Sequence, residues 1–310
     1  MTIALCEALD PRDSYDRETT DIFRQLERLE GEALRRILTR LVEVRRDVID
    51  RLTSLPTFTN EDGTATWQAN QLRLFRHELE DAIHRFGMQY TAGLADDLTA
   101  AANLGKLQMD TLASLAQAVG VPRVVISFGP LGLLDDQIAS VILHSSQLIK
   151  SVEQSMITAI DRQLQMTVLG GQSRWDTVRA IRDLLATDPR RVNGVRRFGS
   201  LTSQAVRIEQ TELIRVFNVA NEFAIRQAQE ELPGIMKEWV TILDSRADPI
   251  CRGLSGKRAK PGEAFPGGYQ RPPDPHPGCR CRLVSFLSDW ETDPNPVGAP
   301  NRRGVPLVPA

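Results

Sequence analysis

The sequence predicts a mainly α fold, in which an N-terminal bundle of long helices precedes a small, loop-rich α+β domain. Apolar residues recur at helical spacing over three long stretches of the first 170 residues, whereas strand-like runs appear only after residue 238. Helices of roughly thirty residues are well above the globular mean and are typical of an elongated bundle. We therefore expect an elongated helical domain (1–170), a small domain (171–289) and an extended proline-rich tail (290–310).

Breaker residues divide the N-terminal apolar pattern into three helices. Their predicted ranges are 19–55, 67–98 and 138–169, and the apolar residues Leu112, Leu115 and Val119 either extend the second helix or follow it. The first is capped at Thr19–Asp21 and stopped by Pro56, and the third is stopped by the Gly170–Gly171 pair. A polar loop (57–66) and a short extended segment (121–130) separate the helices, whose apolar stripes are predicted to form the core of the bundle.

Shorter elements are predicted after residue 171. They are a helix at 173–185, a basic loop at 188–200, a helix at 201–231, a strand at 239–243 and a strand at 280–286. Residues 244–279 are rich in glycine and proline, which favours loops. The sequence therefore predicts one long loop that joins two neighbouring strands.

Basic residues gather in two places although the formal net charge of the chain is −2. Between residues 246 and 282, eight basic residues stand against three acidic ones, a local charge of +5. Such patches can neutralise phosphates without reading the base sequence. The candidate nucleic-acid-binding residues are Arg190, Arg191, Arg196, Arg197, Arg252, Lys257, Arg258 and Lys260. The alternative is a solvated surface that balances the acidic helices, and no interleaved aromatic residues favour base stacking.

Three of the four cysteines and one histidine fall in or beside the predicted loop. The candidate metal ligands are Cys251, His276, Cys279, Cys281 and Asp248. Zinc prefers four nitrogen and sulfur ligands, and prolines around His276 lower the entropy lost when ligands are organised. The alternatives are a disulfide from Cys251 to Cys279 or Cys281, or buried thiols with His276 bonded to the backbone. We also expect synthesis and folding in a cytosol, because the N-terminus does not read as a secretory signal.

A series of short motifs runs in order through residues 200–286. They are Thr211-Glu212, Asn218 with Ala220, Trp239, Asp244-Ser245-Arg246, Leu254-Ser255-Gly256 and the closing segment PPDPHPGCRC at 272–281. In this order and spacing, the set resembles the Mu F-like minor head proteins of tailed bacteriophages, the phage head morphogenesis family. Relatives often carry a cysteine where this chain has Asp248, and this difference favours Cys281 as the fourth zinc ligand.

The resemblance implies a structural, non-enzymatic role in the phage head. It implies a minor capsid component at the portal vertex that acts in head morphogenesis and in DNA packaging or ejection. The implied partners are the portal protein, capsid subunits, packaged DNA and further copies of the chain, with no membrane. The implied location is the virion, after synthesis in the host cytoplasm, and the implied cofactor is structural zinc.

The alternative is an enzyme, a metal-dependent nuclease or transferase that uses the C-terminal cysteine–histidine module. That function needs an open coordination position and a titrating base beside it. Glu212 and Asp244 are the candidate bases.

Overall fold

The structure is a computed structural model that describes residues 11–59, 65–67, 69–118, 132–169, 172–187, 190–192, 195–197, 200–229 and 232–287. Three sequence predictions lie outside these residues: the extended segment at 121–130, the Gly170–Gly171 helix stop and the tail at 290–310.

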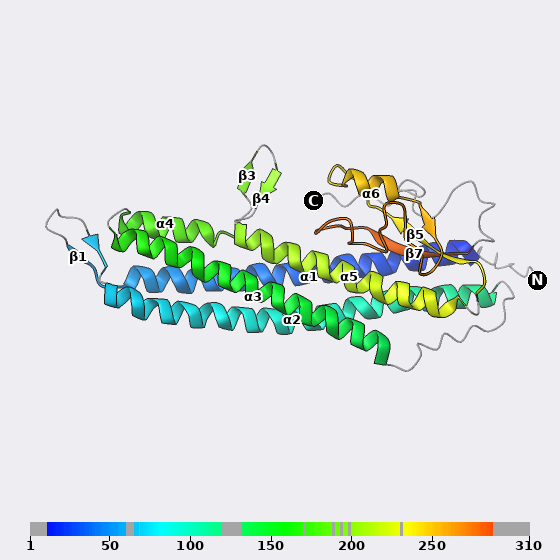
Figure 1. The fold of residues 1–310 in the computed structure, drawn as a ribbon, viewed down its shortest axis with the longest axis horizontal. Helices are drawn as coiled ribbons and strands as arrows, with labels where there is room; N and C mark the ends of the chain where they lie inside the picture. The colour runs from blue at the N-terminus through cyan, green and yellow to red at the C-terminus, as the bar shows by residue number, and fades with distance from the viewer. Residues whose placement is uncertain are drawn as a thin grey trace, which may run out of the picture. The chain divides into compact units, whose positions relative to one another are not determined.

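The predicted fold class is confirmed, because the described residues form six helices and only short strands (Figure 1). The helices are α1 (Pro11–Ser54), α2 (Ala69–Ala118), α3 (Gly132–Val168), α4 (Arg174–Leu184), α5 (Ser200–Ala228) and α6 (Pro249–Leu254). The strands are β1 (Phe58–Thr59), β2 (Ala65–Thr66), β3 (Arg190–Val192), β4 (Val195–Arg197), β5 (Ile235–Val240), β6 (Arg258–Ala259) and β7 (Arg282–Leu287).

The predicted start of the first helix is wrong, because α1 begins at Pro11 and not at Thr19. Tyr15 and Thr19 are both buried, so the apolar stripe extends toward the N-terminus. The hydroxyl of Thr20 donates to the carbonyl of Asp16 at 2.7 Å inside the helix and does not cap it. The rest of the helical pattern matches α2, α3, α4 and α5 within a few residues, and the side chain of Ser173 caps α4.

Three short elements differ from the prediction. The predicted basic loop contains the antiparallel β3–β4 pair, in which Arg190 is opposite Arg197 and Arg191 is opposite Arg196. The strand predicted at 239–243 is β5, which begins earlier, at Ile235. The prediction missed this start because the charged residues Lys237 and Glu238, which are buried in the strand, interrupt the apolar pattern. The predicted loop at 244–279 also contains α6 and β6.

Contacts group the chain into two compact units. The first unit comprises residues 1–30, 97–141 and 210–310, and the second comprises 31–96 and 142–209. Both units draw on helices from each side of residue 170, and the domain division made from the sequence stays a prediction about independent folding.

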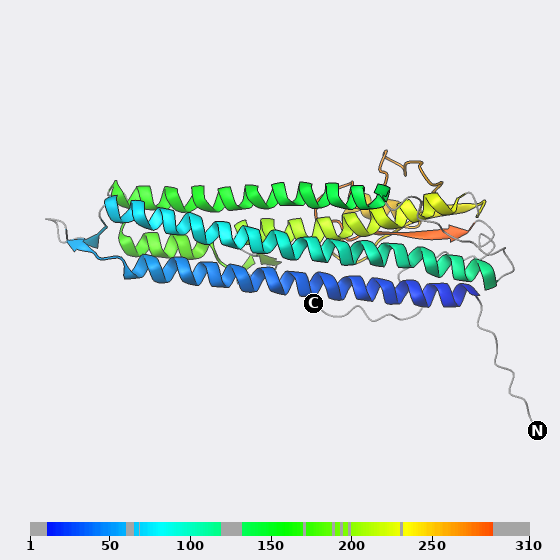
Figure 2. The same cartoon turned by 90° about the horizontal axis from the view of Figure 1, so that it is seen from below.

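The first unit holds the three-stranded sheet, whose order is β6-β5-β7 and whose pairs are antiparallel. Figure 2 shows β7 running beside α5. Side chains bond the outer edge of β7: Asn218 Oδ1 accepts from Leu283 N at 2.7 Å, and Asn221 Nδ2 donates to Leu283 O at 2.8 Å. The hydroxyl of Tyr15, on α1, donates to Ser285 O at 3.0 Å and accepts from Ser285 N at 3.1 Å. Two helices therefore satisfy an edge that would otherwise need another strand.

The second unit is mainly a helix bundle with the small β1–β2 pair beside it. Tyr90 on α2 donates to the carbonyl of Ala205 on α5 at 2.9 Å, and Arg76 on α2 pairs with Asp161 on α3 at 3.2 Å. No helix in the described part of the chain combines the length and the apolar character that crossing a bilayer requires.

Candidate metal centre

The candidate ligands come from α6 and from the loop that leads into β7. Cys251 lies on α6, which begins with Pro249 at its first turn. The Oδ1 atom of Asp248 accepts the Ile250 N–H at 2.8 Å and caps this helix. Asp248 therefore positions Cys251, and it is outside the group of side chains whose ligand atoms converge.

Cys251, His276 and Cys279 bring their ligand atoms within 4.8 Å of one another. The Sγ atom of Cys251 is 3.2 Å from His276 Nε2 and 3.6 Å from Cys279 Sγ. Cys251, Cys279 and Cys281 are free thiols, and a disulfide would need sulfurs about 2.05 Å apart. Two thiolates on a tetrahedral zinc ion, with zinc–sulfur bonds of about 2.3 Å, lie roughly 3.8 Å apart. The spacing of these residues fits a zinc ion.

The second nitrogen of His276 is oriented by the backbone. His276 Nδ1 is 3.1 Å from the carbonyl oxygen of Pro277, the geometry of an N–H donating to that carbonyl. This tautomer leaves Nε2, the atom that faces Cys251, with its lone pair available. Histidines that ligate metals commonly make such a bond with the other ring nitrogen, so the arrangement also fits a metal ligand.

Cys281 belongs to the same buried cluster as Cys251 and Cys279, but it is outside the group of three whose ligand atoms converge. Hydrogen bonds from the thiols of Cys251 and Cys279 lower the pKa of Cys281, although burial opposes this. Thr241 Oγ1 lies 3.4 Å from Cys281 Sγ and donates its own proton to the carbonyl of Cys251 at 2.8 Å. The thiols of Cys251 and Cys279 therefore favour the thiolate of Cys281, the form in which cysteine binds metal.

Helix α5 holds this turn in place through two residues of the sequence motifs. The hydroxyl of Thr211 accepts from Gly278 N at 2.8 Å, in the turn between His276 and Cys279. Asn218 Nδ2 donates to the carbonyl of Cys281 at 3.3 Å, and Asn218 Oδ1 accepts from Leu283 N. The Thr211 and Asn218 motif positions are thus physically joined to the closing segment.

Residues 158–284 match the model of the family described as Phage Mu protein F like protein. The match supports the resemblance of this segment to the Mu F-like phage head morphogenesis family that the sequence motifs predicted. Comparison with curated proteins and with solved structures found no match. The matched Mu F-like segment contains every candidate metal ligand named above and the α5 residues that hold them.

The candidate nucleic-acid-binding residues of the matched segment fall into two groups, one in each compact unit. Arg258 pairs with buried Glu238 at 2.9 Å, and Arg252 donates to the carbonyls of Asp244 and Ala247. Lys257 and Lys260 are exposed, partly or fully. The other four arginines belong to the β3–β4 pair, which lies in a different unit from these residues.

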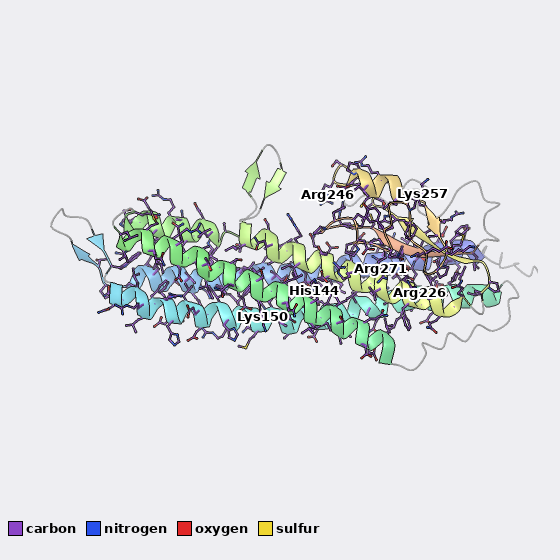
Figure 3. All side chains as sticks on the ribbon, in the orientation of Figure 1. His144, Lys150, Arg226, Arg246, Lys257 and Arg271 are labelled. Atoms are coloured by element: carbon purple, nitrogen blue, oxygen red, sulfur yellow. The ribbon has the colours of Figure 1, made fainter. Side chains whose placement is uncertain are left out.

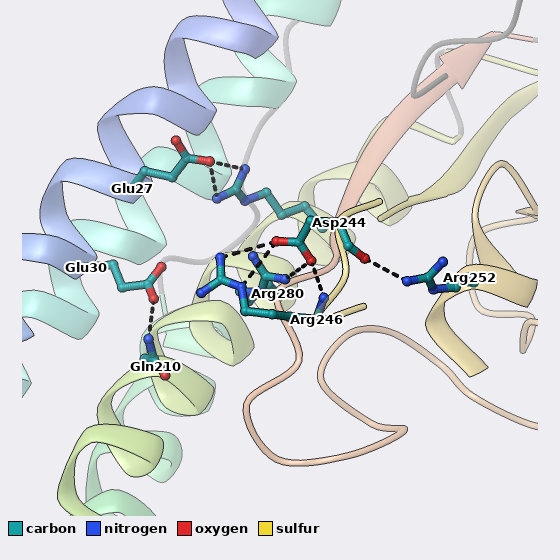
Figure 4. Close-up of polar contacts among 8 residues, drawn as sticks. Glu27, Glu30, Gln210, Asp244, Arg246, Arg252 and Arg280 are labelled. Atoms are coloured by element: carbon teal, nitrogen blue, oxygen red, sulfur yellow. Dashed lines mark hydrogen bonds and ion pairs between the residues drawn. The ribbon is translucent and has the colours of Figure 1, made fainter. Parts of the chain in front are cut away.

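Asp244, a candidate base, is held by arginines (Figure 4). Its Oδ1 atom accepts from Arg280 at 2.7 Å, and its Oδ2 atom accepts from Arg246 at 3.2 Å. The hydrogen bond from Arg280 is the main cause that lowers the pKa of Asp244 to about 2. The other candidate base, Glu212, is buried and pairs with Arg215 at 3.0 Å. Neither carboxylate belongs to the metal-binding group of the described residues.

Sequence reasoning missed a second charged centre in the Mu F-like segment. Buried Glu222 accepts from Lys237 Nζ at 2.8 Å and pairs with Arg271 at 2.5 Å and Arg226 at 3.2 Å. Lys237 also donates to the carbonyl of Gln270 at 2.8 Å. These residues are spread over α5, β5 and the long loop, so no local spacing pattern connects them. The sequence signal for this centre is Lys237, a lysine among the apolar residues of β5.

Proposed function

We propose that the chain is a minor head protein of a tailed phage that docks at the portal vertex and takes part in head assembly. The proposal rests on the observation that side chains of the family motifs form hydrogen bonds to the backbone around the cysteine–histidine turn. Thr211 and Asn218 bond to the backbone of the turn and strand that follow His276, and Asp248 caps α6. Each of these three side chains is bonded to the backbone of the segment that it supports, which favours a structural role.

The proposed cofactor is one structural zinc ion. Cys251, His276 and Cys279 would supply three ligands and Cys281 the fourth. A bound zinc ion would cross-link α6, the proline-rich turn and the start of β7. Four protein ligands are typical of structural zinc, whereas catalytic zinc keeps one position for water.

The proposed DNA contact is the β3–β4 pair. Its register sets two pairs of arginines opposite each other along a ladder of three residue pairs, which concentrates four positive charges on six residues. Contacts of this kind neutralise phosphates without base specificity, as packaged DNA of arbitrary sequence requires.

The enzyme alternative has less support. A carboxylate whose pKa is lowered to about 2, as for Asp244, is a weak base near neutral pH. Glu212 is engaged by Arg215, and neither group joins the cysteine–histidine group in the described residues.

The test is rebinding to heads. Proheads assembled by a phage that lacks this gene are mixed with the purified full chain and sedimented. We expect the chain to sediment with proheads that contain portal and to be absent from portal-free proheads. Equal sedimentation with both, or none with either, would contradict portal docking. Metal-dependent DNA cleavage or group transfer by the purified chain, lost in Glu212→Gln with the fold intact, would favour the enzyme.

A further inference from the structure

A second site lies in the first unit, on the face of α5 that carries the buried Glu222. A cavity of about 280 Å³ opens there between the start of α3, α5 and the loop before His276. Its walls include the polar residues Arg215, Arg226, Arg271, Gln137, Ser140 and Asp274. Apolar side chains Val141, Val219 and Phe223 line it as well.

One carboxylate in this cavity faces three cations. The side chain of Glu222 is 2% exposed, and it contacts Lys237, Arg226 and Arg271 at 2.8, 3.2 and 2.5 Å. Desolvation opposes the charged form of Glu222, yet the three cations lower its pKa overall. The carboxylate of Glu222 and its three cationic partners together carry a net charge of +2. Asp274 on the wall reduces the excess to one.

The guanidinium groups remain within reach of a ligand. The side chains of Arg226, Arg215 and Arg271 are 46%, 33% and 28% exposed. Arg215 pairs with Glu212, whereas the guanidinium groups of Arg226 and Arg271 pair with Glu222. A guanidinium carries five N–H donors in a fork that matches a carboxylate, so further donors remain for a bound anion. Arg226 and Arg271 lie near each other in Figure 3.

The walls select the kind of anion. Val219 and Phe223 place apolar surface beside the arginines, and a sugar–phosphate backbone has no apolar side chain to cover it. An acidic side chain with an apolar neighbour in a polypeptide satisfies both surfaces. We propose that this cavity, the α3–α5 pocket, binds an acidic segment of a partner head protein through Arg226, Arg271 and Arg215. This inference rests on the proposed function.

The test uses the full chain and a fluorescein-labelled peptide, acetyl-Glu-Leu-Glu-Leu-Glu, with the Gln-Leu-Gln-Leu-Gln peptide for comparison. We expect salt-sensitive binding of the acidic peptide only, followed by fluorescence anisotropy. Arg226→Gln removes a charge-assisted contact, which is worth roughly tenfold in affinity. Glu222 keeps Lys237 and Arg271 as partners in this variant, so the fold is expected to survive.

Two further variants keep the test decisive. Gln137→Glu adds a negative charge to an exposed wall residue outside the buried network and should also weaken binding. Arg246→Gln removes a 68% exposed arginine outside the pocket and should leave affinity unchanged. The inference would be overturned if the two peptides bind with equal affinity, or if Arg246→Gln and Arg226→Gln lose the same affinity for the acidic peptide. Displacement of the peptide by duplex DNA would also overturn it. Wild-type binding to portal-containing proheads is measured separately, so failure of the pocket is distinguishable from failure of the proposed function.

Discussion

Replacing Asn218 by alanine tests whether the motif asparagine holds the strand that follows the cysteine–histidine turn. Asn218 is fully buried and binds both Leu283 N, at 2.7 Å, and Cys281 O, at 3.3 Å. Asn218→Ala leaves these two backbone groups without their partner, at about 1–3 kcal/mol for each group. The better helix propensity of alanine returns at most ~0.7 kcal/mol. We expect a net loss of about 3 kcal/mol in the free energy of unfolding.

The assay is thermal unfolding of the full chain, followed by circular dichroism. A loss of about 3 kcal/mol corresponds to a fall in Tm of roughly 6–12 °C for a unit of this size. Asn70→Ala is the matched control, because Asn70 is exposed on α2, and its Tm should change by only about a degree or two. If Asn218→Ala unfolds at the same temperature as Asn70→Ala, Asn218 does not hold β7 in the way described.

Three other substitutions have distinct expected outcomes. Cys279→Ser should remove bound zinc, measured by elemental analysis, and lower the Tm, because it deletes one of the converging ligands. Gly105→Ala should lower stability by about 1–3 kcal/mol in urea unfolding, since the new Cβ would lie 2.4 Å from the backbone oxygen of Phe217, which cannot rotate away. Asp244→Asn should cost about 1–2 kcal/mol at neutral pH, below the full value of the pKa shift because Asp244 is partly solvated. The pKa of Asp244 is about 2 when folded, against 3.8, so this contribution is present above pH 4 and is lost toward pH 2.

Each of these substitutions has a control or a contrary outcome. Cys6→Ser should leave the zinc content unchanged, and a metal-free wild type with the same Tm as Cys279→Ser would remove the case for zinc. Gly31→Ala should stabilise α1 by about 0.5–1 kcal/mol, because no atom lies within 4 Å of its added Cβ. A stable Gly105→Ala would mean that α2 and α5 can separate. The assigned pKa would be contradicted if the difference in unfolding free energy between the wild type and Asp244→Asn grows as the pH falls from 4 to 2.

The candidate site was predictable only in part. The cysteines and His276 stand out by residue type, and three of them do converge. Asp248 was predicted as a ligand on its spacing, yet its carboxylate caps α6, a short helix hidden from pattern analysis by flanking proline and glycine. The sequence Asn193-Gly194 is a signal that favours a two-residue turn between strands, and it could have predicted the antiparallel β3–β4 pair.

The sequence by itself determined the long helices and the family motifs, because helical spacing and breakers such as Pro56 act over a few neighbouring residues. Only the tertiary structure decided what the polar residues do. Tyr15 bonds to Ser285, 270 positions away, and Glu222 gathers three cations from separate elements. The free energy of such contacts depends on burial and on distances through space, and neither is encoded in the local order of residues.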